Sequence, residues 1–293
     1  MAQFTAGLID VFAELPFGGN SLAVVEDADG LSDAQMRRIA GEFNQAETTF
    51  LMNSDRADRK LRSFTASGAE VFGAGHNALG AWLWMGEHGQ LGSLDTPRTF
   101  RQEIGEDVLP ITLVNVGGRV HGRMRQAALR LSAPLATTDS LAKALGLSAG
   151  DVAPFPAARA ADTGAAHLMV RLRDAQAVDH AAPSAPALLA VLGSAGAEGC
   201  YVYAFDPASP DTAYARFFNP TVGLWEDAAT GTAAGPLCAY LGAEGLLNPG
   251  KTLVVEQGVK MGRRSLLQLC LTPDPELSGT GIVVLRGTLA FQD

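Results

Sequence analysis

The sequence predicts an α+β protein built from two similar halves. Three observations predict it: strands and helices follow an order that repeats, each half has a helix that begins at a glycine turn, and the halves share short stretches of sequence. The shared stretches are Arg62-Ser63-Phe64, Glu70 and Gly75-His76-Asn77-Ala78 in the first half, and Arg216-Phe217-Phe218, Glu226 and Gly231-Thr232-Ala233-Ala234 in the second. We expect a diverged duplication in which a pseudo-twofold axis relates the halves.

The first half begins with two strands and a capped helix. Residues 31–43 form the helix, because Ser32 and Gln35 make a capping box ahead of an apolar face at helical spacing. An apolar segment from His76 to residue 84 predicts a second helix, which glycines end. Strands are expected at residues 8–12, 21–25, 48–52 and 61–64.

After residue 98 the pattern changes to strands, and Gly117-Gly118 is a hairpin signal between two of them. We place the domain boundary there, which gives domains 1–117 and 118–293, and leave open whether the last strand returns to the N-terminal half. Helices are expected at residues 139–145, 187–192 and 232–241, and strands at 109–116, 119–124, 128–131, 167–171, 201–205, 213–218, 253–256, 266–271 and 281–290.

Composition excludes several classes of protein. The chain has 293 residues, a formal net charge of −9 and scattered Lys and Arg residues, so we expect no nucleic-acid partner. Its three cysteines show no CxxC spacing, which predicts neither a disulfide framework nor a zinc site and favours the cytoplasm. The N-terminus lacks the basic and apolar regions of a signal peptide, and no apolar run is long enough to span a membrane.

The two glycine turns predict an anion site. A helix start presents unpaired N–H groups and a partial positive charge, and two facing starts could hold one carboxylate from both sides. Gly75 and Gly231 would let the backbone approach the ligand, and the hydroxyl of Thr232 would donate to it. The structural alternative is that the glycines only let the helices pack closely.

Three titratable residues accompany these turns. Glu47 lies where a helix has ended and an apolar strand begins, so partial desolvation would favour its neutral acid and suit proton transfer. His76 and Asp227 each lie beside a glycine turn. The alternatives are a surface glutamate, a histidine that bonds the helix backbone, and a capping aspartate.

At these residues the chain resembles the phenazine-biosynthesis isomerase family, the PhzF-like proteins, which share the diaminopimelate epimerase fold. The resemblance covers nearly the whole chain and rests on five motifs in order: Leu8 to Phe12 with Gly19 to Val24, Asn44 to Phe50, Glu70 to His76, Glu226 to Gly235, and Glu256-Gln257-Gly258 with Met261-Gly262-Arg263.

The resemblance implies two domains, each a mostly antiparallel β-sheet wrapped around a central helix, with the active site between them. It implies isomerisation of a small carboxylic acid by proton transfer, without a cofactor or a metal. Glu47 would be the general acid/base and His76 and Asp227 its polar partners in catalysis. The substrate would be bound by Gly75, Asn77, Gly231 and Thr232. The family is often dimeric, so a homodimer is one expectation.

The sequence departs from the family's pattern around the site. Phe72-Gly73 replaces Pro-Phe, Asn77 and Ala228 each stand where a different residue is usual, and Thr232 replaces Ser. These changes leave the substrate open. Neither glycine turn contains cysteine, so racemisation by two thiols is disfavoured.

Other functions stay open as alternatives. Gly73-Ala74-Gly75 with Asp95 about twenty residues on is similar to a dinucleotide fingerprint, but the third glycine is misplaced, which disfavours an NAD-dependent oxidoreductase. A non-catalytic protein of the same fold that binds a small molecule or a partner is the main alternative. A metallohydrolase is weaker, because the five histidines show no HxxxH or HxH spacing.

Overall fold

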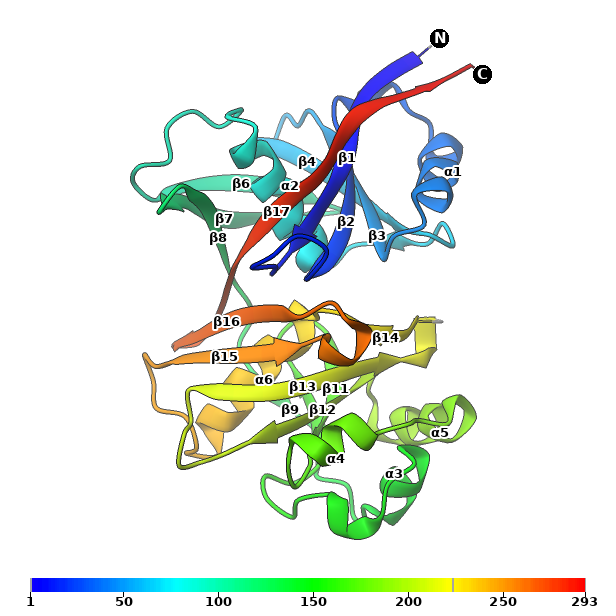
Figure 1. The fold of residues 1–293 in the computed structure, drawn as a ribbon, viewed down its shortest axis with the longest axis vertical. Coiled ribbons are helices and arrows are strands. Elements are labelled where there is room, and N and C mark those ends of the chain that lie inside the picture. Colours follow the sequence, from blue (N-terminus) through cyan, green and yellow to red (C-terminus); the bar gives the residue numbers. More distant parts are fainter. Residues whose placement is uncertain (1, 223, 293) are drawn as a thin grey trace. The chain divides into compact units, whose positions relative to one another are not determined.

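The computed structural model describes residues 2–222 and 224–292, and the chain divides into two units (Figure 1). Unit 1 comprises Met1–Met124 with Ser278–Asp293, and unit 2 comprises Arg125–Leu277. The last strand therefore returns to the first unit.

Unit 1 is a closed β-barrel around one helix. Its strands are β1 (Ala2–Val11), β2 (Asn20–Val25), β3 (Glu47–Met52), β4 (Arg59–Thr65), β5 (Glu70–Val71), β6 (Arg98–Ile104), β7 (Asp107–Val116), β8 (Arg119–Arg125) and most of β17 (Asp274–Phe291). The pairs β1–β2, β3–β4, β6–β7 and β7–β8 are antiparallel, while β2–β3 and β4–β6 are parallel. Strand β17 pairs with both β8 and β1, which closes the ring.

Helix α2 (His76–Glu87) fills this barrel. All residues from His76 to Met85 are buried, as expected of a helix that is apolar on every side. Gly80 lets the helix lie close to the wall, because a Cβ there would be 2.6 Å from Val11 Cγ2 and 2.7 Å from Leu22 Cδ2. Helix α1 (Asp33–Phe43) covers the outside of the barrel, and the predicted Ser32–Gln35 capping box is present.

Unit 2 wraps a second sheet around helix α6 (Gly231–Ala243). Its strands are β9 (Arg130–Leu131), β10 (Arg159–Asp162), β11 (Ala166–Arg171), β12 (Gly199–Phe205), β13 (Thr212–Asn219), β14 (Leu224–Asp227), β15 (Thr252–Gln257) and β16 (Ser265–Thr272). The remaining helices are α3 (Asp139–Ala144), α4 (Ala175–His180) and α5 (Ala185–Ala195), which pack with β11 and β12 in one apolar cluster.

The predicted duplication is confirmed by the strand pairing. Unit 2 repeats the pairing pattern that unit 1 shows from β1 to β7. Its antiparallel pairs are β10–β11, β12–β13, β13–β14 and β15–β16, and its parallel pairs are β11–β12 and β13–β15.

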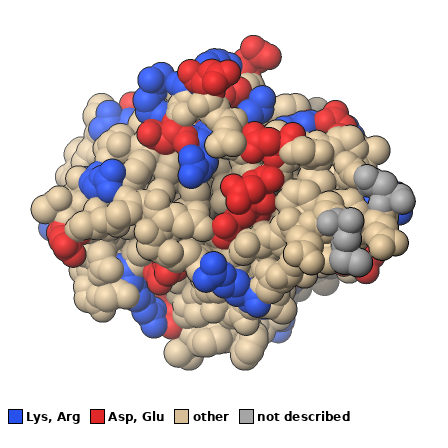
Figure 2. Space-filling model, turned by 90° about the horizontal axis from the view of Figure 1, so that it is seen from above, with Lys and Arg blue, Asp and Glu red and all other residues tan. Residues whose placement is uncertain are grey.

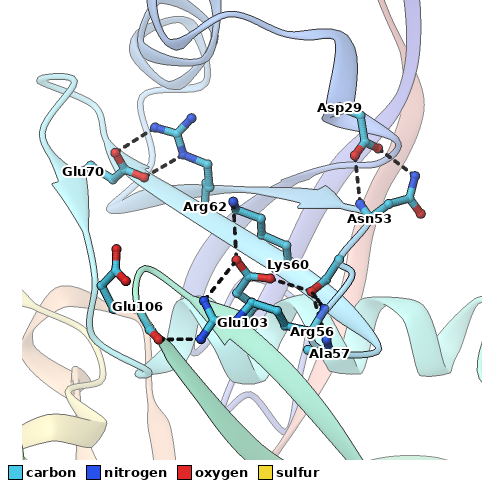
Figure 3. A network of polar contacts seen from close by, with 10 residues as sticks. Asp29, Asn53, Arg56, Ala57, Lys60, Arg62, Glu70, Glu103 and Glu106 are labelled. Atoms are coloured by element: carbon cyan, nitrogen blue, oxygen red, sulfur yellow. Dashed lines mark hydrogen bonds and ion pairs between the residues drawn. The ribbon is translucent and has the colours of Figure 1, made fainter.

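The repeat extends to side chains. Arg62 forms a two-bond ion pair with Glu70 at 2.7 and 2.8 Å, which ties β5 to β4 (Figure 3). Arg216 makes the equivalent pair with Glu226, with both bonds at 2.8 Å. Each guanidinium also lies over the ring of the phenylalanine two residues on. In each unit this pair anchors the strand that leads into the glycine turn.

The structure also differs from the sequence expectations. Gly117 and Gly118, with φ of 62° and 83°, form the β7–β8 hairpin inside unit 1, so the chain leaves that unit after Met124 instead. Strands β5, β6, β10 and β14 and helix α4 were not expected. The strand expected at residues 281–290 is part of the longer β17, which begins in unit 2.

Candidate active site

The carboxylate of Glu47 lies against the imidazole of His76 in unit 1. Glu47 is the first residue of β3, paired with Leu22 on one side and Thr65 on the other, and His76 is the first residue of α2. Glu47 Oε2 is 2.9 Å from His76 Nε2, a close approach that is not aligned as a hydrogen bond. The side chains are 19% and 9% exposed, so most of the surface of each is withdrawn from water.

The turn before α2 is held by Asn77. Its Oδ1 accepts from the N–H of Gly75 at 2.8 Å, and its Nδ2 donates to the carbonyl of Gly73 at 3.0 Å and to Ser63 Oγ at 3.1 Å. Asn77 is buried, with only 3% of its surface exposed. Two residues expected to bind substrate therefore bond to one another, and the amide of Asn77 shapes the turn.

Asp227 lies in a second polar turn, in unit 2. It ends β14 and is 8% exposed, and its Oδ2 accepts from Thr230 Oγ1 at 2.5 Å. Thr230 caps α6, so the carboxylate is fixed beside a helix start. A negative charge there is stabilised by the helix dipole.

Gln257, the last residue of β15, stabilises this turn through hydrogen bonds to Asp227 and Thr230. Its Nε2 donates to the carbonyl of Asp227 at 2.8 Å and to Thr230 Oγ1 at 3.0 Å. Its Oε1 accepts from Tyr201 OH at 2.8 Å and from the N–H of Thr230 at 3.3 Å. All four hydrogen-bonding positions of a completely buried amide are used. In the sequence, Gln257 stands out only as part of the Glu256-Gln257-Gly258 motif, and nothing there indicates its role.

The start of α6 offers backbone donors. Within residues 2–222 and 224–292, no hydrogen bond engages the N–H groups of Gly231 and Thr232, which belong to the first turn of the helix. The hydroxyl of Thr232 lies 3.3 Å from Nε2 of His167, a buried residue that the sequence analysis did not select. Gln126 Nε2 donates to the carbonyl of Gly231 at 2.9 Å and so fixes the turn from the other side.

The two units carry different chemistry at equivalent positions. The strand pairing aligns Thr48 and Phe64 of unit 1 with Cys200 and Phe218 of unit 2, so Gly199 occupies the place of Glu47. The repeated turn motif aligns Thr232 with His76. The carboxylate and imidazole pair is thus found in one unit, and a hydroxyl takes the imidazole's place in the other.

Further features bear on the alternative functions. Helix α2 is enclosed by a barrel, whereas a dinucleotide fingerprint opens a helix that packs on a parallel sheet, and Asp95 accepts from Ser93 Oγ in a turn. Among the described residues, no three His, Cys, Asp or Glu side chains are grouped as metal ligands, and no helix combines the length and apolar character of a membrane span. Acidic and basic side chains are interspersed on the face shown in Figure 2.

Comparison with known proteins places this arrangement in a family. The sequence model of the phenazine biosynthesis-like proteins, PhzC-PhzF, matches residues 9–287. The chain is 33% identical to the trans-2,3-dihydro-3-hydroxyanthranilate isomerase of Pseudomonas chlororaphis over 299 residues, which covers 97% of this chain and 98% of that protein.

Solved structures agree with this result. The phenazine biosynthesis protein of the PhzF family from Bacillus anthracis superposes with a TM-score of 0.89 at 26% identity, over 99% of this chain and all of that one. A hydroxyproline epimerase from Agrobacterium vitis shares the fold at 12% identity, with a TM-score of 0.67 over 99% of this chain and 93% of that one. The epimerase-like fold expected from the sequence is confirmed.

Proposed function

Because the chain belongs to the phenazine biosynthesis-like PhzC-PhzF family and is an isomerase, we propose that it moves a proton on a small unsaturated carboxylic acid. In this proposal Glu47 is the general acid/base, and no cofactor takes part. The observation that carries the proposal is the Glu47–His76 pair. It places a partly exposed carboxylate, the group that would exchange the proton, 2.9 Å from an imidazole at a helix start.

Glu47 acts in two steps of one reaction. Its carboxylate removes a proton from a carbon made acidic by neighbouring unsaturation, and the electrons of that C–H bond enter a shifted double bond. The protonated Glu47 then delivers the proton to another carbon of the same system. His76 stabilises the carboxylate and orients it, which suits a group that must alternate between charged and neutral forms.

Unit 2 is assigned to binding in this proposal. The open N–H groups of Gly231 and Thr232 and the hydroxyl of Thr232 would hold the substrate carboxylate, because a helix start favours an anion. Asp227, fixed by Thr230 and Gln257, would orient an amino or hydroxyl group of the substrate. We assign Gly75 and Asn77 to shaping the turn in front of His76, since their polar groups bond to one another.

A single base in one unit favours a shift of double bonds over racemisation. Racemisation by two bases needs a proton acceptor on each side of the carbon, and Gly199 provides none at the position equivalent to Glu47. The substrate class therefore has unsaturation next to an acidic C–H. Trans-2,3-dihydro-3-hydroxyanthranilate, on which the Pseudomonas chlororaphis relative acts, belongs to this class and is our first candidate.

The proposal is tested by conversion of trans-2,3-dihydro-3-hydroxyanthranilate and a panel of unsaturated carboxylic acids, followed by NMR of the products. We expect isomerised product with the unmodified protein and at least a hundredfold less with Glu47→Gln, because a positioned acid/base contributes about 10²–10⁴-fold in rate. Glu70→Gln is the matched control, since Glu70 pairs with Arg62 in the same unit. Binding of panel members without conversion would favour a non-catalytic binding protein instead.

A further inference from the structure

His167 is a buried histidine of unit 2 that has no histidine counterpart in unit 1 and no role in the proposed mechanism. It is on β11, paired with Gly199, and is 3% exposed. The equivalent residue of unit 1 is Leu22, which pairs with Glu47 in the same way. A polar ring in place of leucine at a buried sheet position calls for a specific partner.

The partner of His167 is Thr232. His167 Nε2 is 3.3 Å from Thr232 Oγ1, whereas Nδ1 is buried and has no hydrogen-bond partner among the described residues. The ring also meets the edge of Phe217, with centroids 4.9 Å apart and planes at 81°, which limits its rotation.

The ring is neutral under ordinary conditions. Burial lowers the pKa of His167 to about 4, and the negative charge of Asp162 offsets this only in part. A neutral imidazole has one nitrogen that donates and one that accepts. The position of the single ring proton therefore decides which of the two partners, His167 or Thr232, donates.

The unpartnered nitrogen indicates where that proton lies. A buried N–H without an acceptor is rarer in proteins than an acceptor that lacks a donor. On this ground the ring proton is assigned to Nε2, whose N–H then donates a hydrogen bond to Thr232 Oγ1, and Nδ1 is the bare nitrogen. The hydroxyl oxygen of Thr232 then acts as acceptor toward His167, and its own hydrogen is left to donate to another group.

We propose that His167 is a positioning residue that turns the hydroxyl of Thr232 into a committed hydrogen-bond donor for the substrate carboxylate at the start of α6. This rests on the proposed function, in which Thr232 binds that carboxylate. Without His167 the hydroxyl can rotate to bond a carbonyl of the preceding turn, as Ser and Thr often do in helices. With it, the hydroxyl joins the N–H groups of Gly231 and Thr232 as a third donor.

The ring proton can be located directly in the ligand-free protein. Long-range ¹H–¹⁵N NMR of histidine-labelled protein distinguishes the two neutral tautomers, and His167→Gln identifies the signals by their loss. We expect a neutral ring at pH 7 with the proton on Nε2. A neutral ring with its proton on Nδ1 overturns the proposal whatever the substrate is, because Nε2 would then accept a hydrogen bond from the Thr232 hydroxyl and that hydroxyl would not be left as the donor.

Binding of 3-hydroxyanthranilate, measured by calorimetry, tests the consequence. Loss of a hydrogen bond to a charged group costs about 1.5–3 kcal/mol, so we expect His167→Leu to weaken binding about tenfold or more. His167→Gln should bind nearly as well as the unmodified protein, since its amide N–H can replace the ring N–H. Binding of 2-aminophenol, which lacks the carboxylate, should not change in either variant.

Thr232→Val separates the inference from the proposed function. It should weaken binding of 3-hydroxyanthranilate, and adding His167→Leu to it should cause no further loss, because the two residues act through one hydroxyl. Equal affinity of Thr232→Val and the unmodified protein contradicts the assignment of Thr232 in the proposed function. Weak binding by Thr232→Val together with full binding by His167→Leu, or additive losses in the double variant, overturns the role of His167.

Discussion

At the scale of single residues, the two units differ at the position of Glu47. Glu47 in unit 1 corresponds to Gly199 in unit 2, and a Cβ at Gly199 would lie 2.4 Å from the Phe217 ring. The space that a second carboxylate would need is thus filled by an aromatic side chain. The proposed chemistry with a single base is consistent with this packing as well as with the glycine at position 199.

His167 makes the stability of the protein depend on pH. Its pKa falls from 6.5 in the unfolded chain to about 4 in the folded one, so between these values the unfolded chain binds more protons. The stability that the neutral ring contributes is complete above pH 6.5 and is lost as the pH falls toward 4. The shift corresponds to about 3 kcal/mol.

The measurement is urea-induced unfolding between pH 7 and pH 4.5. We expect the free energy of unfolding to decline more steeply in the unmodified protein than in His167→Gln, which does not titrate. Parallel declines in the two proteins would show that His167 is not held neutral by burial.

The candidate site could be predicted from the sequence in part. Glu47, His76, Asp227 and Thr232 lie in short motifs, so local sequence was enough to select them. His167 and Gln257 could not be found this way. His167 is 65 residues from Thr232 along the chain, and Gln257 is at least 27 residues from its partners. Only the fold brings them together.

At the scale of elements, an arginine holds each glycine turn to its sheet. The side chain of Arg216 is 8% exposed. Besides its pair with Glu226, it donates to the carbonyls of Val178 and Asp179 within α4 and of Ala181 just after it. Arg62, by contrast, is 19% exposed and makes its second ion pair with the exposed Asp33.

The two arginines should therefore differ in their effect on stability. Arg216→Met removes the two bonds to the largely buried carboxylate of Glu226 and the donor to the carbonyls of Asp179 and Ala181, so we expect it to cost about 3–5 kcal/mol. Arg62→Met, the matched change in unit 1, should cost roughly 1 kcal/mol, since water reaches its partners. Denaturant unfolding of both variants checks this, and equal losses would contradict the account.

Elements with strong local signals were predicted well. The capping box of α1 and the glycine pair between β7 and β8 are local features, and both are confirmed. Strand β6 was missed because its sequence, RTFRQEI, is mostly polar, and its burial depends on neighbours that the sequence does not show. Strand β14 was missed because it is short and pairs with β13 through an irregular register.

At the scale of the whole molecule, the end of the chain completes the first unit. Strand β17 pairs with β1 along ten residue positions and also with β8, so without it both strands would present open edges. The sequence left this return undecided, because an apolar strand at the C-terminus is compatible with pairing in either half.

Unit 1 should accordingly fold only when residues 278–293 are present. We expect a fragment of residues 1–124 to be unfolded or aggregated, whereas the same fragment joined to residues 278–293 by a flexible linker should give dispersed amide signals in NMR. A folded, monomeric 1–124 fragment would show that the barrel does not need its closing strand.

The most direct test of the account is the transfer of deuterium to carbon in D₂O. The protein is incubated with trans-2,3-dihydro-3-hydroxyanthranilate, and NMR follows deuterium at the carbon positions of substrate and product. We predict that deuterium enters carbon with the unmodified protein and enters at least a hundredfold more slowly with Glu47→Gln. Undiminished incorporation by Glu47→Gln would contradict the central claim that Glu47 carries the proton.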